Sequence, residues 1–160
     1  MKKFKKQNGF TLIETIIYIA LFGFLIGSAF VTAYNIIEGS GKLNYKIINQ
    51  EEANFVLRKL NWALMGIENI ENPTIDSPTS STLIIDKHDG NKITFQLNTG
   101  KIEIKESANG NIFLPITTEN VTVSNLDFTY LKEQNGSPEG ITATFNLGGN
   151  NFNITKYLRK

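Results

Sequence analysis

An apolar run over residues 15–37 carries no charged side chain, and it limits the folds open to this chain more than any other feature. As an α-helix the run would be roughly 34 Å long, which is enough to cross the hydrocarbon core of a bilayer. Lys2, Lys3, Lys5 and Lys6 precede it, and Glu14 stands at its entrance. An acidic group in a membrane helix costs on the order of 3 kcal/mol on insertion scales. Glu14 therefore requires an explanation.

The length and composition of the chain limit what can accompany this segment. A chain of 160 residues holds one modest domain in addition to a membrane helix. The chain has 16 basic and 15 acidic residues, so removing the four leading lysines leaves twelve basic residues against 15 acidic ones. This balance argues against a general nucleic-acid-binding surface. Since cysteine is absent, disulfides, zinc–thiolate sites and thiol nucleophiles are excluded.

Three interpretations of residues 1–37 compete. The lysine-rich start and the small residues around Ala33 suit a cleaved secretory signal, but such signals have an apolar centre of only about 7–15 residues. A plain transmembrane anchor explains the length and keeps the lysines on the cytoplasmic side, yet it leaves Glu14 without a partner. Cleavage between Gly9 and Phe10 would supply one, because the new amine lies one helical turn from Glu14. The amine and the carboxylate would then pair within one chain or between neighbouring helices. The low dielectric of lipid or of a packed helix bundle would strengthen their attraction.

The order of these parts, a short lysine-rich leader, Gly9, Phe10, Glu14 and a continuous apolar helix, resembles type IV pilin-like proteins with a class III signal peptide. The resemblance implies that prepilin peptidase cuts between Gly9 and Phe10 and methylates the amine of Phe10. It also implies that Glu14 guides the subunit into a growing filament. The implied partners are membrane lipid, other pilins or pseudopilins, an inner-membrane platform protein and an assembly ATPase.

The chain departs from the main type IV pilins in two features, and these favour a resemblance to accessory members of the family. No proline stands between Met1 and Asn72, where the main pilins usually have a helix-kinking proline, and there is no C-terminal disulfide. The chain is therefore most similar to a minor pilin or a minor pseudopilin of the J or W type. Gly23 and Gly27 form a small-xxx-small pair, which would let another helix approach closely.

The helical pattern continues beyond the apolar run. Apolar residues keep helical spacing as far as Ile67, although Gly39 and Gly41, at about 1 kcal/mol each relative to alanine, could bend or break the helix. The sequence predicts a leader at 1–9, a transmembrane and assembly helix at 10–38, an amphipathic continuation at 39–67 and a globular antiparallel β domain at 68–160.

After Pro73 the pattern changes to alternation punctuated by turn residues, which is typical of antiparallel strands. Asp89-Gly90-Asn91 and Asn98-Thr99-Gly100 are candidate hairpin turns. The predicted strands are 82–85, 93–97, 102–104, 112–116, 121–123, 126–130, 141–145 and 152–157. The predicted fold class is α+β, with a long N-terminal helix packed on an antiparallel β-sheet head.

The head offers few groups for chemistry. His88 is the only histidine and lies between Asp86 and Asp89, but the adjoining Asp-Gly-Asn sequence favours a turn over an ion site. Calcium needs six to eight oxygens, so residues such as Asn111, Glu119, Glu133 or Glu139 would have to contribute. A single histidine without cysteine gives no nucleophile–base set, and no phosphate-binding glycine loop is present. We predict no catalytic residue, metal or cofactor and expect no enzyme. The polar residues 132–140 suit an exposed loop.

The predicted function is that of a minor pilin or pseudopilin in the cytoplasmic membrane, with its N-terminus cytoplasmic and its C-terminal domain outside. It would assemble into, or prime, a type IV pilus, a type II secretion pseudopilus or a DNA-uptake filament, at the cell surface or in the periplasm. The alternative is a single-pass anchor that displays a β domain for ligand or surface binding without a filament. DNA capture by the head would need clustered cations, since residues 73–160 carry eight basic and nine acidic side chains.

Overall fold

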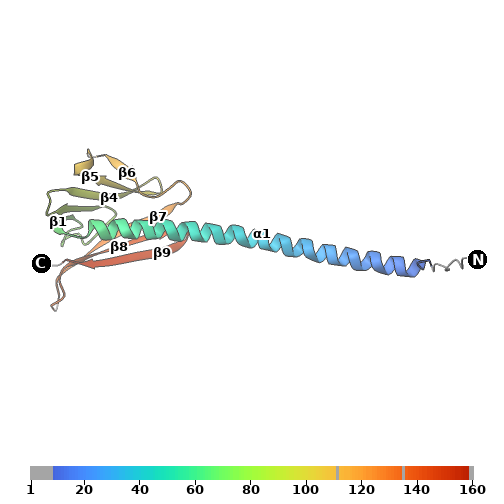
Figure 1. Ribbon diagram of the computed structural model, residues 1–160. Coiled ribbons are helices and arrows are strands. Elements are labelled where there is room, and N and C mark those ends of the chain that lie inside the picture. Colours follow the sequence, from blue (N-terminus) through green and yellow to red (C-terminus); the bar gives the residue numbers. More distant parts are fainter. Residues whose placement is uncertain (1–8, 111, 135, 159–160) are drawn as a thin grey trace, which may run out of the picture. The chain divides into compact units, whose positions relative to one another are not determined.

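The computed structural model describes residues 9–110, 112–134 and 136–158. They form one long helix and two antiparallel sheets (Figure 1), which confirms the predicted α+β class. The chain divides into two compact units, Met1–Asn44 and Tyr45–Lys160.

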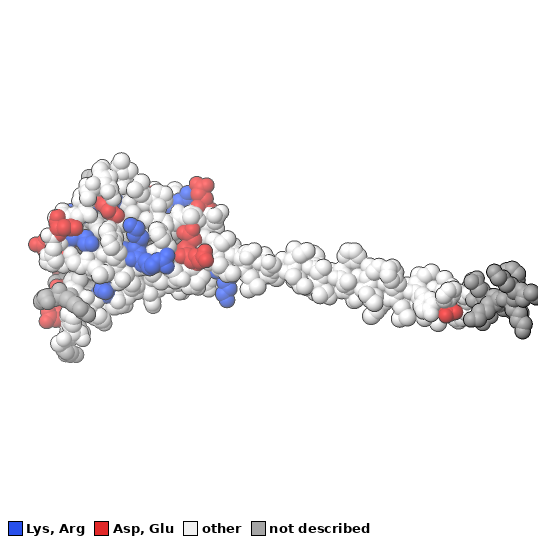
Figure 2. Space-filling model, in the orientation of Figure 1, with Lys and Arg blue, Asp and Glu red and all other residues white. Residues whose placement is uncertain are grey.

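Helix α1 spans Leu12–Ala63 and is continuous through Gly39 and Gly41, so these glycines do not break it. Its N-terminal part is long and apolar enough to cross a membrane, and among the described residues none of its most apolar window is buried. Figure 2 shows this stretch as uncharged surface except for an acidic patch at its N-terminal end. The side chains here are therefore left for lipid or for other helices.

The helix ends at Ala63 instead of the predicted Ile67, which is the first residue of β1. Leu64 still donates its backbone N–H to the Leu60 carbonyl at 2.9 Å. Gly66 then takes a left-handed φ of 70°, a conformation that ends helices and that glycine adopts without steric cost. The helical spacing of apolar residues continued past this glycine, and that is why the sequence pattern overestimated the length of the helix.

The first sheet has five strands in the order β1-β3-β4-β5-β6, and all neighbours are antiparallel. Its strands are β1 (Ile67–Asn72), β3 (Leu83–Lys87), β4 (Lys92–Asn98), β5 (Lys101–Glu106) and β6 (Phe113–Pro115). A short 3₁₀ helix, η1 (Ser107–Asn109), follows β5. Both predicted hairpins join neighbours in this sheet, β3 to β4 and β4 to β5.

The second sheet has four strands in the order β2-β7-β8-β9, also antiparallel throughout. Its strands are β2 (Thr79–Ser80), β7 (Val123–Leu131), β8 (Gly140–Leu147) and β9 (Asn150–Tyr157). The two predicted strands at 121–123 and 126–130 correspond to the single strand β7, whose pairing with β8 is irregular between Val123 and Asn125. The sequence predicted neither β1 nor β2, since β1 has isoleucine at only two of its six positions and β2 has two residues.

The core of the 45–160 unit lies between one face of α1 and both sheets. Ala53, Val56, Leu60 and Ala63 recur at helical spacing and are fully buried. Phe95 from the first sheet and the pair Phe128 and Phe145 from the second sheet supply the largest buried side chains. With no cysteine in the chain, this packing and the strand pairing hold the head together.

Candidate processing and assembly site

The Gly9–Phe10 junction lies in non-helical backbone just before α1. Both residues are exposed, and the Phe10 side chain is 77% accessible. Among the described residues, and apart from its chain neighbours, no atom lies within 4 Å of the place that a Cβ on Gly9 would occupy. The described part of the fold therefore leaves room for a side chain at this position, and both residues of the junction are accessible from outside the chain.

Thr11 caps the helix that follows. The backbone N–H of Glu14 donates to Thr11 Oγ1 at 3.4 Å, and the backbone N–H of Thr15 donates to the Thr11 carbonyl at 3.2 Å. Thr11-Leu12-Ile13-Glu14 is the capping-box pattern, in which threonine and glutamate stand three residues apart at a helix start. Glu14 also lies in the first turn, where the helix dipole favours a negative charge. The junction sequence thus fixes where the helix begins.

The Glu14 side chain is half-buried and lies beside two aromatic rings. Its Oε1 accepts a hydrogen bond from the Tyr18 hydroxyl at 3.2 Å. The Tyr18 ring meets the Phe10 ring edge-on, with centroids 6.3 Å apart. Phe10, Glu14 and Tyr18 therefore follow one another at one-turn intervals along one side of the chain. Sequence reasoning overlooked Tyr18, although its position four residues after Glu14 was the available signal.

Gly23 and Gly27 both lie on exposed surface of α1. Among the described residues, and apart from the adjoining helix backbone, no atom comes within 4 Å of a Cβ placed on either residue. The role of this pair in helix packing remains a prediction.

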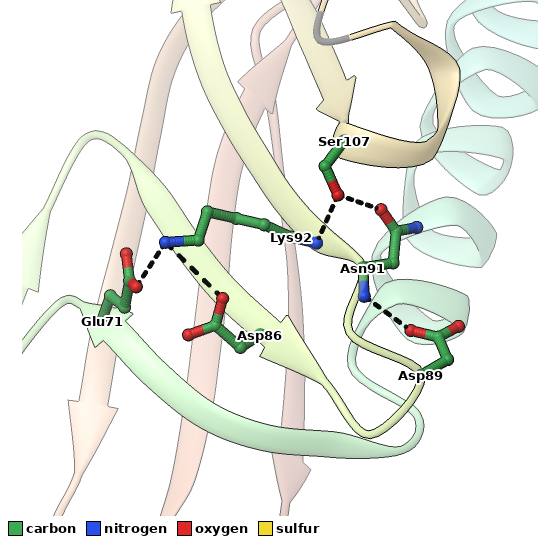
Figure 3. A network of polar contacts seen from close by, with 6 residues as sticks. All are labelled: Glu71, Asp86, Asp89, Asn91, Lys92 and Ser107. Carbon is green, nitrogen blue, oxygen red and sulfur yellow. Dashed lines mark hydrogen bonds and ion pairs between the residues drawn. The ribbon is translucent and has the colours of Figure 1, made fainter.

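The Asp89-Gly90-Asn91 segment is a turn, as predicted (Figure 3). Asp89 Oδ1 accepts the backbone N–H of Asn91 at 2.9 Å, and Asn91 Oδ1 accepts the Ser107 hydroxyl at 2.7 Å. The backbone N–H of His88 donates to the Gly66 carbonyl at 3.3 Å. Within the described ranges, no group of three or more histidine, cysteine or acidic side chains is arranged to hold a metal ion.

Asp86, the other acidic neighbour of His88, belongs to an ion-pair network across three strands (Figure 3). Lys92 on β4 lies 3.6 Å from Asp86 on β3 and also pairs with Glu71 on β1. The hydrogen bond to Glu71 raises the pKa of the Lys92 ammonium above its usual value, and the charge of Asp86 adds to this effect. The Asp86 carboxylate is therefore part of the ion-pair network that links β1, β3 and β4.

Residues 132–134 and 136–138 are exposed, as expected for the loop between β7 and β8. One contact fastens the base of this loop, because the Tyr130 hydroxyl donates to the Glu139 carboxylate. This hydrogen bond, together with desolvation, raises the pKa of Tyr130 to about 12.

Comparison with known families identified one match. A family model described as a prokaryotic N-terminal methylation motif matches residues 4–30, which include the junction and the first turns of α1. No curated protein and no solved structure matched the chain. The motif implies processing by prepilin peptidase and assembly with other pilins. Together with the apolar helix it makes the chain a single-pass, membrane-anchored protein. These findings support a type IV pilin-like protein.

Proposed function

We propose that the chain is a minor pilin or minor pseudopilin that is cut between Gly9 and Phe10 and methylated on the amine of Phe10. The observation that carries this proposal is the methylation motif, which leads directly into a helix whose most apolar window is not buried within the described chain. Residues 10–38 would hold the subunit in the cytoplasmic membrane, with the N-terminus in the cytoplasm and the head outside. Its role would be assembly and not catalysis.

Glu14 is the proposed assembly residue. Among the described residues its carboxylate accepts one side-chain hydrogen bond, from Tyr18, so it has acceptor capacity left for an amine. Cleavage would create such an amine at Phe10, whose ring lies on the same side as Tyr18. Two unit charges about 4 Å apart attract by roughly 4 kcal/mol at an effective dielectric constant near 20. A neighbouring subunit's amine would therefore be drawn to Glu14 within a helix bundle.

Three features support an accessory subunit over a main one. The first 72 residues contain no proline, α1 is uninterrupted, and the head has no disulfide. A long helix leaning on antiparallel strands is also the layout that resembles the J and W types. A platform protein and an ATPase would provide the energy for assembly. The system served would be a type IV pilus, a type II secretion pseudopilus or a DNA-uptake filament.

The test removes the charge at Glu14 and measures incorporation into filaments. We expect Glu14→Ala to be cut normally but to reach the sheared filament fraction at least tenfold less than the unaltered chain. Glu38→Ala is the matched control, because Glu38 is the other acidic residue near the apolar run and pairs with Lys42 at 2.7 Å. Unchanged incorporation of Glu14→Ala would exclude the charge-pairing role. Absence of the unaltered chain from every filament fraction would support the single-pass anchor.

A further inference from the structure

The two sheets of the head have four edge strands, and three of them are blunted. β2 has two residues, and β6 has three and ends on Pro115. β1 has two register shifts in its pairing with β3. Short strands, prolines and irregular pairing are devices that keep an edge from accepting another strand. These three edges are therefore protected.

The fourth edge strand, β9, has none of these devices. It lies at the margin of the head (Figure 1), contains no proline and pairs with β8 over eight consecutive residues without a register shift. Its only charged side chain is that of Lys156, which donates to Asn61 Oδ1 on α1 at 3.3 Å and so points towards the helix. A long, regular and unprotected edge is a template for a further strand.

The two-residue turn at Gly148 and Gly149 determines which backbone groups of β9 face outwards. Both glycines have left-handed φ values, 59° and 81°, as in a type I′ hairpin turn. The residues that flank such a turn exchange hydrogen bonds, so Leu147 and Asn150 form a hydrogen-bonded pair and the pattern alternates from there. The outward N–H and C=O groups belong to alternate residues of the strand, Asn151, Asn153, Thr155 and Tyr157. Among the described residues, no backbone hydrogen bond joins these groups to another element.

The side chains of β9 indicate which residues an added strand should carry. Phe152 and Ile154 lie on the face that packs against the core, but both are only partly buried. Residues directly opposite each other in an antiparallel pair share a face, so apolar side chains opposite these two would extend the core. On the other face, Asn151, Asn153 and Thr155 are exposed and uncharged. Polar residues therefore suit the alternate positions of the added strand.

Lys156 adds a charge to this pattern. Because side chains alternate along a strand, it lies on the same face as Phe152 and Ile154, and among the described residues it takes part in no ion pair. A pocket of about 450 Å³ lies beside it, lined by residues 64–67, by His88 and by residues 156–158. This space can admit a side chain that brings a carboxylate to the Lys156 ammonium.

We propose that an extended segment of another protein pairs antiparallel with β9 and becomes a fifth strand of the second sheet. The segment carries an acidic residue opposite Lys156 and apolar residues opposite Ile154 and Phe152, with polar residues between them. Antiparallel pairing continues the arrangement of this sheet and is slightly more stable per residue than parallel pairing. A second copy of β9 fits less well, because the strand has no acidic residue and self-pairing leaves both Lys156 ammonium groups without a carboxylate. The inference goes beyond the proposed function and does not depend on it, since this edge belongs to the head.

Designed peptides test this mode of binding on the full chain in detergent micelles. The probe is a fluorescein-labelled peptide of sequence T-E-T-I-T-V-T, which sets glutamate opposite Lys156 and a threonine opposite each outward residue. We expect saturable binding in fluorescence polarisation. Methylating the backbone nitrogens of the two inner threonines should weaken binding at least tenfold, because those N–H groups would bond to Thr155 and Asn153. Methylating the isoleucine and valine nitrogens instead is the matched control and should change binding less than about threefold.

Substitutions in β9 test the same contact from the side of the chain. Thr155→Pro removes an outward N–H that makes no bond to β8, so the head should still fold while the probe binds at least tenfold more weakly. Thr155→Ala is its matched control, because it also loses the hydrogen bond to Thr142 but keeps the N–H. Lys156→Glu should lose the probe and bind instead a peptide with lysine in place of glutamate, which also shows that this variant is folded.

The proposal would be overturned by equal binding of the two methylated peptides, by equal binding to the Thr155→Pro and Thr155→Ala chains, or by no binding of the probe to the unaltered chain. Asn153→Cys tests a second copy as the occupant. A disulfide-linked dimer that forms without peptide, and that Thr155→Pro abolishes, would place a second copy on β9 and would also overturn the proposal. A monomeric chain that binds the probe through the threonine N–H groups would support it.

Discussion

The contact between Asn49 on α1 and the β8–β9 turn allows a prediction of stability in the head. Asn49 is only 2% exposed, and its Oδ1 has no hydrogen-bond partner among the described residues. A Cβ on Gly148 would lie 2.1 Å from Nδ2 and 2.7 Å from Cγ of Asn49. The whole buried carboxamide would have to move to accept Gly148→Ala. We therefore expect this substitution to destabilise the head strongly.

The magnitude follows from two separate costs. Overpacking a well-packed site costs typically 1–3 kcal/mol. The φ of Gly148 is 59°, and a non-glycine residue in this left-handed region costs roughly 1–2 kcal/mol more. Gly149→Ala separates the two, because Gly149 has a φ of 81° but nothing within 4 Å of its added Cβ. We expect a loss of about 2–5 kcal/mol for Gly148→Ala and about 1–2 kcal/mol for Gly149→Ala.

Urea unfolding of the full chain in detergent micelles, followed by the fluorescence of Trp62, measures these losses, since Trp62 is the only tryptophan. Asn49→Ala removes the obstructing carboxamide, so combining it with Gly148→Ala should recover about 1–3 kcal/mol relative to additivity. Combined with Gly149→Ala it should be additive. Equal losses at the two glycines, or additivity at Gly148, would refute the steric reasoning.

Three further predictions concern the rest of the head. Leu60→Ala should cost about 2–5 kcal/mol in the same urea assay, because Leu60 is fully buried between α1 and the sheets; a smaller loss would mean that this face does not pack as described. Tyr130 should titrate near pH 12 in ultraviolet absorbance, and Glu139→Gln should shift its pKa towards 10. Since folding raises this pKa, the associated stability is present below pH 10 and lost as the pH rises towards 12, and Tyr130→Phe should remove that dependence. Lys92→Met should lower the urea midpoint less than Leu60→Ala, and 1 M salt should shrink its effect, because the ion pairs of Lys92 are partly exposed.

The sequence predicted the parts of the fold that have a strong local pattern. The apolar run predicted the N-terminal helix. Alternating apolar and polar residues, bounded by turn residues, predicted β3, β4, β5, β8 and β9 close to their observed bounds. Strand order was not predictable, because pairing between distant segments such as β2 and β7 depends on packing and not on local pattern. The division into two sheets was missed for the same reason.

At the candidate site, the sequence indicated Gly9, Phe10 and Glu14 through their order along the chain. It did not indicate that Thr11 caps the helix or that Tyr18 donates to Glu14, although both follow from three- and four-residue spacings. The division of α1 into a buried face and an exposed face within the head was beyond sequence reasoning for a different reason. Several apolar residues of α1 recur at helical spacing, and only the structure separates those that face the core, such as Val56, from those that stay exposed, such as Phe55.

The N-terminus of the mature protein tests the central claim most directly. The chain is extracted from membranes of cells that contain prepilin peptidase, and its intact mass and N-terminal sequence are determined. We predict a chain that begins at Phe10 with the mass of one added methyl group, and an uncut chain from cells without the peptidase. A chain that still begins at Met1 in the presence of the peptidase, or one cut near Ala33 as a secretory signal would be, would contradict the account.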